Sequence, residues 1–392
     1  MASSEHSPRS LPLELIEEIL NRIPAESLNR FKSACKEWHD LITDKRFMYN
    51  HLDHSPERFI RFDDKKTVQI MDPVTGILTY SPILNEFCYP YLIDYMVHCD
   101  GLMLCMFNDS GVQQAIHANL AVWNPLTRKM KWIQPLVCYY TADYFGIGYN
   151  NTCRHNYKIL RFSGPLSFEF KYCEIYEFKS DSWRILDATK LFDWAVDTQC
   201  RGVSVKGNMY WIAKRKDKEA FILSFDFSTE KFTDICFCPG CETQQQYYPF
   251  LFPHLCTTRR IGCFNGDRLS LLLQHGQAWS MDIEVLVTNK LSDEVVSFSR
   301  YFNVSSPLLP ALQPSYNKAH PGYFIGKHGN IMVWSEGYVN EYNKCYTCII
   351  LYQIDKGGIR KQIETRGHQK SRYHTSFISS YVYVPSLIPV QV

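Results

Sequence analysis

A group of cysteines in the middle of the chain has the spacing of metal ligands. The group comprises Cys236, Cys238, Cys241, His254 and Cys256, with Cys345 and Cys348 far downstream. A structural zinc site needs four such side chains arranged as a tetrahedron. However, Cys236 and Cys238 flank Phe237 in a stretch with the period of a strand, which places both thiols on one face, and cysteine is a common small core residue. We therefore expect core packing and neither a metal nor another cofactor, with zinc binding as the alternative.

Motifs that carry catalytic chemistry are absent from the sequence. It contains no phosphate-binding loop, no His-Glu-x-x-His and no Gly-x-Ser-x-Gly. The stretch Gly146-Ile147-Gly148 lacks the third glycine of a dinucleotide-binding fingerprint, and the 13 histidines form no His–Glu or His–Asp pair at ligand spacing. We therefore expect no catalytic residues, although a site that the fold assembles from distant residues would leave no linear motif.

Charge and composition narrow the class of protein. The 392 residues include 42 Lys and Arg against 40 Asp and Glu, so the net charge is +2. This balance disfavours a nucleic-acid binder, which usually shows a strong basic excess. No apolar run approaches the ~18 residues of a membrane span, and the first ten residues hold no apolar leader segment. We expect neither nucleic acid nor a membrane as a partner.

The cysteine content and one basic run indicate in which cellular compartment the protein is expected. The 15 cysteines, an odd number, fit free thiols in a reducing compartment better than a disulfide framework. We therefore expect the protein in the cytoplasm, the nucleus or both. The run Lys214-Arg215-Lys216-Asp217-Lys218 has the composition of a nuclear signal, but such a run is more often the exposed tip of a hairpin.

Residues 11–52 have the apolar spacing of helices. In the first helix the apolar residues at this spacing are Leu15, Ile16, Ile19, Leu20 and Ile23, and Pro24 ends the pattern. The second helix holds Leu28, Phe31, Cys35 and Trp38. A third begins with Thr43 or Asp44 as its cap. We expect a domain of three helices after a disordered segment 1–10. The apolar faces are too wide for so short a domain, so either a partner chain or the rest of the protein covers them.

Residues 57–390 alternate short apolar and aromatic runs with turn signals. Aromatic residues, which make up 15% of the chain, favour strands. The tips of recurring tight hairpins are Gly101, Gly207, Gly266 and Gly329, and Asn150-Asn151 and Asp63-Asp64 complete a series of six. Units of about 50 residues with four strands each are typical of kelch-like propeller blades. We therefore expect an all-β, six-bladed propeller whose ring is closed by the tail near Tyr383–Leu387, with an irregular pair of β-sandwiches as the alternative.

The helical segment resembles an F-box. The matching residues are the run Leu11-Pro12-Leu13-Glu14-Leu15-Ile16-Glu17-Glu18-Ile19-Leu20, then Arg22 to Leu28, Arg30-Phe31-Lys32, Cys35 to Trp38, and Leu41-Ile42. The resemblance implies that the segment docks on a Skp-type subunit and, through it, on the cullin and RING subunits of a ubiquitin ligase. The docking residues expected from the resemblance and the helical spacing are Leu11, Pro12, Ile16, Ile19, Leu20, Ile23, Pro24, Leu28 and Trp38.

The strand region resembles the plant F-box-associated domain. The run Gly101-Leu102-Met103-Leu104-Cys105 matches the family's Gly-Leu-x-Leu-Cys, and Trp123-Asn124-Pro125-Leu126-Thr127 matches its Trp-Asn-Pro-x-Thr. The closing Tyr383-Val384-Pro385-Ser386-Leu387 matches as well, whereas the family's Tyr-Ser-x-x-x-x-Ser-Trp has only an approximate counterpart between Tyr176 and Trp183. The two resemblances imply an F-box at 11–52 and an associated domain at 57–390. They also imply a non-catalytic substrate adaptor of a Skp–cullin–F-box ubiquitin ligase.

The sequence does not specify the substrate protein. Long candidate loops are Leu186–Cys200, Cys236–Cys256 and Val304–Gly322. The candidate substrate contacts are Phe192, Trp194, Tyr247 and Tyr248, because Trp and Tyr commonly anchor protein interfaces. Packing of these rings in the propeller core is the alternative. The alternative function is a kelch-type propeller enzyme or a small-ligand-binding lectin with a helical cap.

Overall fold

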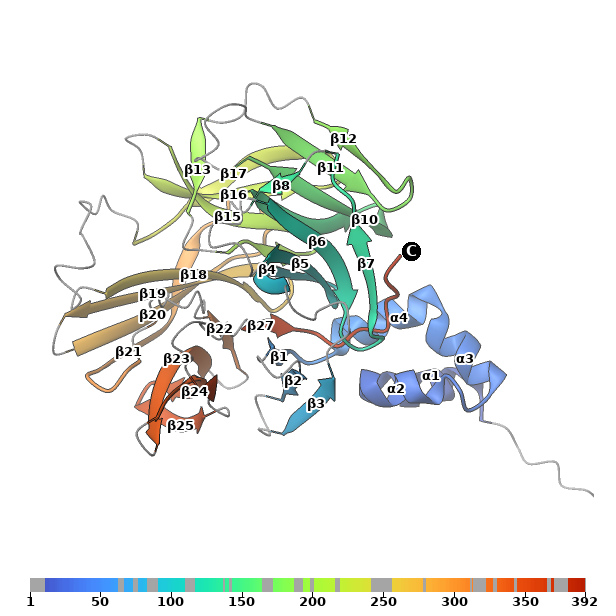
Figure 1. Ribbon diagram of the computed structural model, residues 1–392, viewed down its shortest axis with the longest axis horizontal. Helices are drawn as coiled ribbons and strands as arrows, with labels where there is room; N and C mark the ends of the chain where they lie inside the picture. The colour runs from blue at the N-terminus through green and yellow to red at the C-terminus, as the bar shows by residue number, and fades with distance from the viewer. Residues whose placement is uncertain are drawn as a thin grey trace, which may run out of the picture.

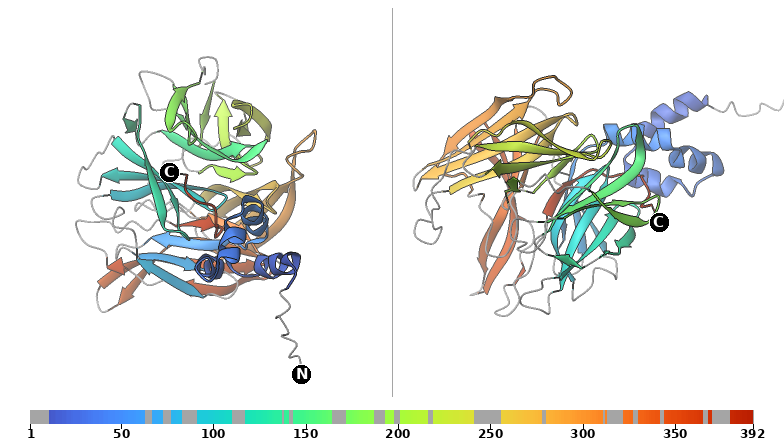
Figure 2. Two further views of the ribbon diagram at one scale, coloured as in Figure 1. Left: turned by 90° about the vertical axis from the view of Figure 1, so that its right-hand side faces the viewer. Right: turned by 90° about the horizontal axis from the view of Figure 1, so that it is seen from above.

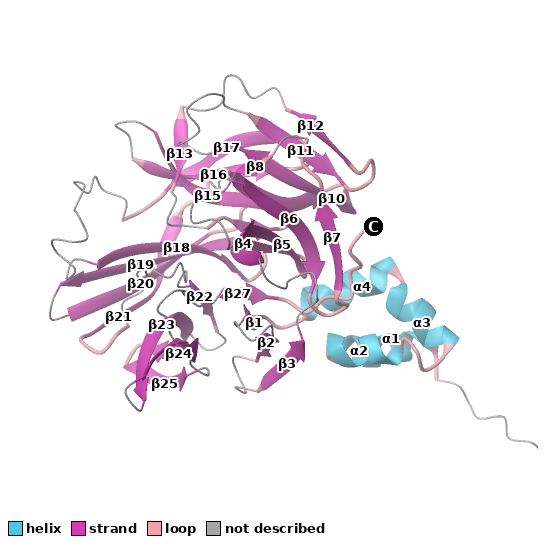
Figure 3. Ribbon diagram, in the orientation of Figure 1, coloured by secondary structure: helices cyan, strands magenta, loops and turns pink. Residues whose placement is uncertain are grey.

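The computed structural model contains helices and then antiparallel sheets around a common axis (Figures 1 and 3). It describes residues 11–62, 67–72, 77–82, 91–109, 117–136, 138–140, 143–163, 172–186, 193–197, 201–215, 219–240, 256–277, 280–310, 312, 322–326, 330–341, 344–364, 368–369 and 380–391. The expected disordered segment 1–10 lies outside these residues.

The helical region comprises α1 (Leu13–Asn21), α2 (Ala25–Phe31), α3 (Lys36–Thr43) and α4 (Lys45–His54). Pro12 and Pro24 directly precede α1 and α2, where the missing N–H of proline costs no hydrogen bond. Asp44 caps α4, since its Oδ1 accepts a hydrogen bond from the Phe47 backbone N–H at 3.1 Å. None of these helices is long and apolar enough to cross a membrane.

The region has four helices where the apolar pattern predicts three. The backbone N–H groups of Ser33 and Ala34 bond the carbonyls three residues back, at 3.3 and 2.9 Å, and these tight turns end α2. Cys35 then adopts an extended conformation, with φ −156° and ψ 166°, before α3 begins. The apolar spacing of three and four residues continues across this break, so periodicity alone predicts a single helix.

Six antiparallel sheets, called blades 1 to 6 in chain order, form the rest of the described chain. Blade 1 contains β27 (Ser380–Tyr383), β1 (Arg58–Phe62), β2 (Thr67–Met71) and β3 (Leu78–Pro82); blade 2 contains β4 (Tyr91–Cys99), β5 (Leu102–Asp109), β6 (His117–Asn124), β7 (Lys129–Ile133) and β8 (Tyr139–Tyr140). Blade 3 contains β9 (Tyr144–Asn150), β10 (Cys153–Phe162), β11 (Cys173–Glu177) and β12 (Ser182–Ile185); blade 4 contains β13 (Trp194–Val196), β14 (Val203–Val205), β15 (Asn208–Arg215), β16 (Ala220–Asp226) and β17 (Lys231–Phe237). Blade 5 contains β18 (Cys256–Phe264), β19 (Arg268–Gln277), β20 (Ser280–Thr288) and β21 (Phe298–Ser306); blade 6 contains β22 (Gly322–Ile325), β23 (Ile331–Glu341), β24 (Lys344–Asp355), β25 (Gly358–Glu364) and β26 (His368–Gln369).

The blades form a six-bladed propeller, which confirms the fold expected from the sequence (Figure 2). The hairpin tips have the left-handed backbone that a two-residue turn requires: φ is 53° at Asp100 and 82° at Gly101, and 47° at Lys206 and 77° at Gly207. The predicted tips at Gly329 and Asp63-Asp64 lie outside the described residues.

The end of the chain closes the ring. Strand β27 pairs with β1, with Tyr383 opposite Arg58 and Val382 opposite Phe59, so the first blade takes its innermost strand from the end of the chain. Contacts of β27 with β22 on one side and β4 on the other complete the circle of inner strands. Closure by pairing removes exposed sheet edges from the ring.

The segment after β27, residues 384–391, lies between the propeller and the helices, and we call it the tail. The Asn124 side-chain amide donates hydrogen bonds to the carbonyls of Ser386 at 3.0 Å and Ile388 at 2.6 Å. A Cβ added to Gly101 would lie 2.0 Å from the Ser386 Cβ, so only glycine leaves room for the tail there. Leu387, 2% exposed, belongs to the same apolar cluster as the helical core residues. Strand β27 and the tail together therefore complete the ring and the helical core.

We expect deletion of residues 380–392 to destabilise both units at once, because it unpairs β1 and leaves a cavity among the helices. The measurements are thermal unfolding and limited proteolysis, with cleavage expected in the helices as well as in blade 1. Deletion of residues 1–10 is the control and is expected to change neither. A 380–392 deletion that unfolds like the full chain would contradict the closure.

Candidate functional site

Exposed apolar side chains concentrate at the start of the helical region. Of the eleven large apolar residues that are exposed among the described residues, four lie on or just before α1. These four, which we call the α1 surface, are Leu11 (55% exposed), Leu13 (59%), Leu15 (47%) and Ile19 (51%). Several exposed aliphatic side chains within one short segment indicate a surface that another chain covers.

The structure divides the docking residues that were expected from the sequence into three groups. Leu11, Pro12, Ile19 and Pro24 are exposed, and Ile16, Ile23 and Trp38 are partly buried. Leu20 and Leu28 are 2% and 0% exposed and pack inside the helical core of the free chain, and their part in docking stays a prediction. The apolar stripe on α1 is wide, so one part of it packs against the other helices and the rest faces solvent. The spacing of the apolar residues does not tell which of them are buried. Leu13 and Leu15, which were not among the expected docking residues, are exposed as well.

A single arginine of blade 3 ties the helical region to the propeller. The Arg154 guanidinium pairs with Asp53 of α4 at 2.9 Å and with Asp100 of blade 2 at 2.8 Å. It also lies over the ring of Tyr49 in α4, 4.8 Å from the centroid, in a cation–π contact. Together with Leu387 of the tail, these contacts hold the helices at one end of the ring (Figure 2).

The propeller has two ends that differ in what lies on them. The turns Asp100-Gly101, Lys206-Gly207 and Asn265-Gly266 line one cavity together with residues 52–57, so these turns mark the end that carries the helices, which we call the near face. Each outer strand runs away from this face, and β12, β17 and β21 therefore end on the opposite, far face. The three long candidate loops begin directly after or near the ends of these strands.

Among the expected substrate contacts, Trp194 alone lies within the described residues; Phe192, Tyr247 and Tyr248 lie outside them. Trp194 starts β13 opposite Arg215, at the far end of blade 4. Its ring is partly buried and packs against Phe162 and Phe232, with centroids 5.9 and 5.2 Å apart. These contacts favour the alternative stated for this residue, which is packing against the core.

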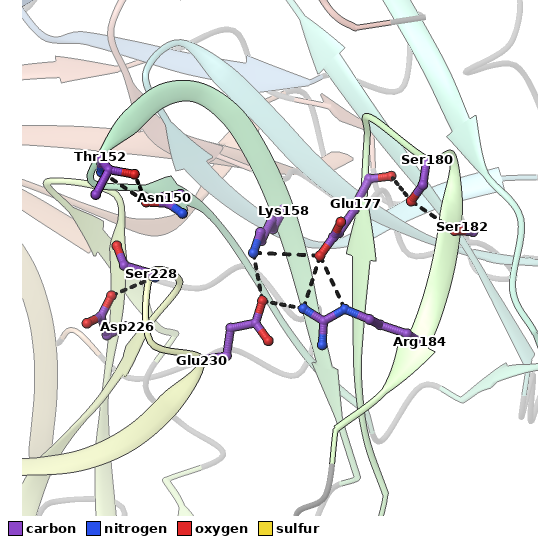
Figure 4. Close-up of polar contacts among 10 residues, drawn as sticks. All are labelled: Asn150, Thr152, Lys158, Glu177, Ser180, Ser182, Arg184, Asp226, Ser228 and Glu230. Atoms are coloured by element: carbon purple, nitrogen blue, oxygen red, sulfur yellow. Dashed lines mark hydrogen bonds and ion pairs between the residues drawn. The ribbon is translucent and has the colours of Figure 1, made fainter.

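A network of charged side chains joins blade 3 to blade 4 (Figure 4). Lys158 pairs with Glu230 at 2.6 Å, and Arg184 pairs with Glu177 at 3.0 Å and also with Glu230. The Ser228 hydroxyl accepts a hydrogen bond from the Asn151 backbone N–H at 2.8 Å, which attaches the same turn of blade 4. The network contains two cations and two anions, so its net charge is zero. It links blade 3 to blade 4.

The cysteines considered as zinc ligands pack as apolar residues where the structure describes them. Cys238 is fully buried and Cys236 partly buried in one cluster between blades 4 and 5, so both thiols share a face. Burial raises the pKa of Cys236 to about 11, which keeps its thiol protonated at neutral pH. Within the described part of the chain, no three His, Cys, Asp or Glu side chains converge as metal ligands.

A cavity of about 980 Å³ lies at the near face, beneath the helices. The end of α4 contributes Leu52 and Asp53 to its wall, and the link between α4 and β1 contributes Ser55 and Glu57. Blades 2 to 6 and the inner strand β27 supply the rest of the lining. A cavity of this size, at the meeting point of two units, is a typical place for a small ligand.

Glu57 is the unusual residue of this cavity. Its side chain is partly buried, and among the described residues its carboxylate receives no hydrogen bond and no ion pair. Burial without a partner disfavours the charged form and raises the pKa of Glu57 to about 7. No pattern in the sequence marks this residue, because its isolation depends on what the fold places around it.

We expect Trp194→Ala to lower the free energy of unfolding by about 2–3 kcal/mol, because it removes a partly buried ring from the contacts with Phe162 and Phe232. Denaturant unfolding measures the change. Phe237→Ala, at a 49% exposed aromatic residue of the same blade, is the control and should cost less than about 1 kcal/mol. Unchanged stability of Trp194→Ala would instead assign this ring to an interface.

We expect Glu57→Gln to stabilise the protein at pH 8 but not at pH 4. The folded-state pKa lies above the ordinary 4.5, so the folded protein holds this proton more tightly and loses stability as the pH rises from about 4.5 through 7. The difference in free energy of unfolding at pH 8 should be about 1–3 kcal/mol. Glu14→Gln, on the exposed face of α1, is the control. A Glu57→Gln effect that does not vary with pH would rule out an unpaired carboxylate.

Comparison with known proteins agrees with this division into helices and a propeller. Residues 9–50 match the F-box domain, and residues 54–390 match the F-box associated beta propeller domain. The chain is 63% identical to the putative F-box only protein 15 of Arabidopsis thaliana, over the whole of both chains. It is 56% identical to the Arabidopsis F-box protein At3g08750, over 97% of each chain. Among solved structures, TolB from Acinetobacter baumannii aligns with a TM-score of 0.39 and 11% identity, over 85% of this chain and 70% of TolB. The chain therefore belongs to the family of F-box proteins that carry an F-box-associated β-propeller domain.

Proposed function

We propose that this chain is the substrate-recognition adaptor of a Skp–cullin–F-box ubiquitin ligase. The observation that carries the proposal is the exposed α1 surface, which belongs to an F-box fixed rigidly to one end of a propeller. The α1 surface docks on a Skp-type subunit, and through it the chain joins the cullin and RING subunits. Burial of exposed aliphatic side chains is the main source of affinity in such a contact.

The far face of the propeller holds the substrate protein in this proposal. Segments that connect one blade to the next begin on that face, and connecting segments on a rigid scaffold commonly carry recognition. Phe192, Tyr247 and Tyr248 fall in these segments and stay candidate contacts. Because the helices and the substrate-binding segments are at opposite ends of the propeller in this proposal, the bound substrate does not collide with the Skp-type subunit.

The chain itself performs no chemistry in this proposal. It contributes proximity, because holding a substrate lysine near a charged ubiquitin-transferring enzyme raises the effective concentration of the two reactants. The chain acts in the cytoplasm, the nucleus or both, where its partners are proteins rather than nucleic acid or membranes. The 15 cysteines suit such a reducing compartment.

We expect Leu15→Ala with Ile19→Ala to weaken binding of a purified Skp-type subunit by about 30- to 1,000-fold. Truncating two aliphatic side chains that become buried on docking removes about 2–4 kcal/mol, at ~1.4 kcal/mol per tenfold change in affinity. Both residues are about half exposed in the free chain, so its thermal unfolding should stay unchanged. Leu11→Ala with Pro12→Ala should weaken binding to a smaller extent.

Isothermal titration of the full chain with the Skp-type subunit is the measurement. The matched control is Ile185→Ala, which truncates an exposed aliphatic residue of blade 3 (73% exposed) and should leave affinity unchanged. If Leu15→Ala with Ile19→Ala binds within a factor of three of the unaltered chain, the α1 surface is not the docking site.

A further inference from the structure

We propose that the cavity beneath the helices is a binding site for a small organic cation, a protonated primary amine, held by an ion pair with Glu57 and by aromatic side chains of blade 6. The inference does not depend on the adaptor role, since it concerns a different surface from the α1 surface and the far face. Its starting point is the cavity of about 980 Å³ at the near face.

The charge of the ligand follows from which acidic groups in the wall already have partners. Asp53 and Asp100 both pair with Arg154, and Asp267 lies 3.7 Å from the Arg268 guanidinium. Among the described lining residues, Glu57 is the carboxylate that has neither a hydrogen bond nor an ion pair. A carboxylate in this state is stabilised by any donor that enters the cavity, and most strongly by a cation.

The basic groups of the wall do not supply that donor. Arg154 is engaged by its two carboxylates, and Arg260 donates a hydrogen bond to the Arg259 carbonyl at 2.7 Å. The Arg201 guanidinium lies 5.8 Å from the Tyr95 ring centroid, in a cation–π contact. Burial without a counter-ion raises the pKa of Glu57 to about 7, and neither these three arginines nor Lys206, the lysine of the wall, opposes that shift. Among the described residues, Glu57 therefore has a vacant place beside it for positive charge.

The apolar part of the wall suits the carbon skeleton of such a ligand. Tyr323, Phe324 and Trp334 of blade 6 line the same cavity as Glu57. Aromatic side chains attract organic cations through the negative faces of their rings and exclude water from the ion pair. A carboxylate combined with aromatic walls selects an amine over a neutral molecule of the same shape.

The size and position of the cavity favour a small molecule over a protein segment. Its volume matches the range of small-molecule sites, about 300–1,000 Å³. The end of α4 and the link to β1 form part of the wall at this end of the ring, whereas the segments between blades begin on the far face. Because the wall combines the α4–β1 link with five blades, a bound ligand would bridge the F-box and the propeller.

The test titrates the purified full chain at pH 8 with three molecules of similar shape: 2-phenylethylamine, 2-phenylethanol and 3-phenylpropanoate. We expect saturable binding of one amine per chain, at least tenfold tighter than the alcohol, and no binding of the carboxylate. The amine should also raise the unfolding temperature, because it binds the folded state.

Two variants assign the effect to its residue. Glu57→Gln should reduce amine binding to the level of the alcohol, while Asp267→Asn, at a carboxylate of the same wall that already has a partner, should keep the tenfold preference. The proposal is overturned if the amine does not saturate, if the alcohol or the carboxylate binds as tightly as the amine, or if Glu57→Gln keeps the preference. Loss of preference in Asp267→Asn as well would assign the effect to the general charge of the cavity and would also overturn it.

Discussion

The position of the tail between the propeller and the helices is the constraint on which the rest of the structure depends. Residues 380–383 supply the inner strand of blade 1, and Leu387 fills the helical core a few residues later. The Asn124 amide holds the segment on both sides of Leu387 through the carbonyls of Ser386 and Ile388. Ring closure and F-box folding therefore share one short piece of chain, and neither unit has a complete core without it.

The fold was largely predictable from the sequence because its signals are local. Glycine at Gly101 and Gly207 marks hairpin tips that need a left-handed backbone, and their recurrence predicts blades. Asp63-Asp64 was predicted as the first hairpin tip of the series. In the chain it falls between β1 and β2, the second and third strands of blade 1, whereas Gly101 and Gly207 follow the innermost strands of their blades. The reason is that the inner strand of blade 1 comes from the other end of the chain.

The candidate sites were only partly predictable because they depend on contacts between distant residues. Helical spacing predicted that Leu20 and Ile19 lie together on the docking stripe. In the structure, the tail residue Leu387 packs against the helical cluster that contains Leu20, so this edge of α1 is buried. Arg154, which ties blade 3 to Asp53, belongs to no motif. Glu57 looks like any surface glutamate in the sequence. Periodicity identifies which residues are apolar, whereas packing decides which face is buried.

The shared use of the tail has a consequence for how the protein is made. A ribosome releases the F-box helices first, but Leu387, which completes their core, is synthesised more than 300 residues later. At about 5–20 residues per second, the helices wait on the order of 20–70 s with an incomplete core. During that time their inner apolar surface is open to chaperones and to premature partners. Only a chain translated as far as Leu387 has the complete helical core, so shorter products carry an F-box whose inner apolar surface is still open.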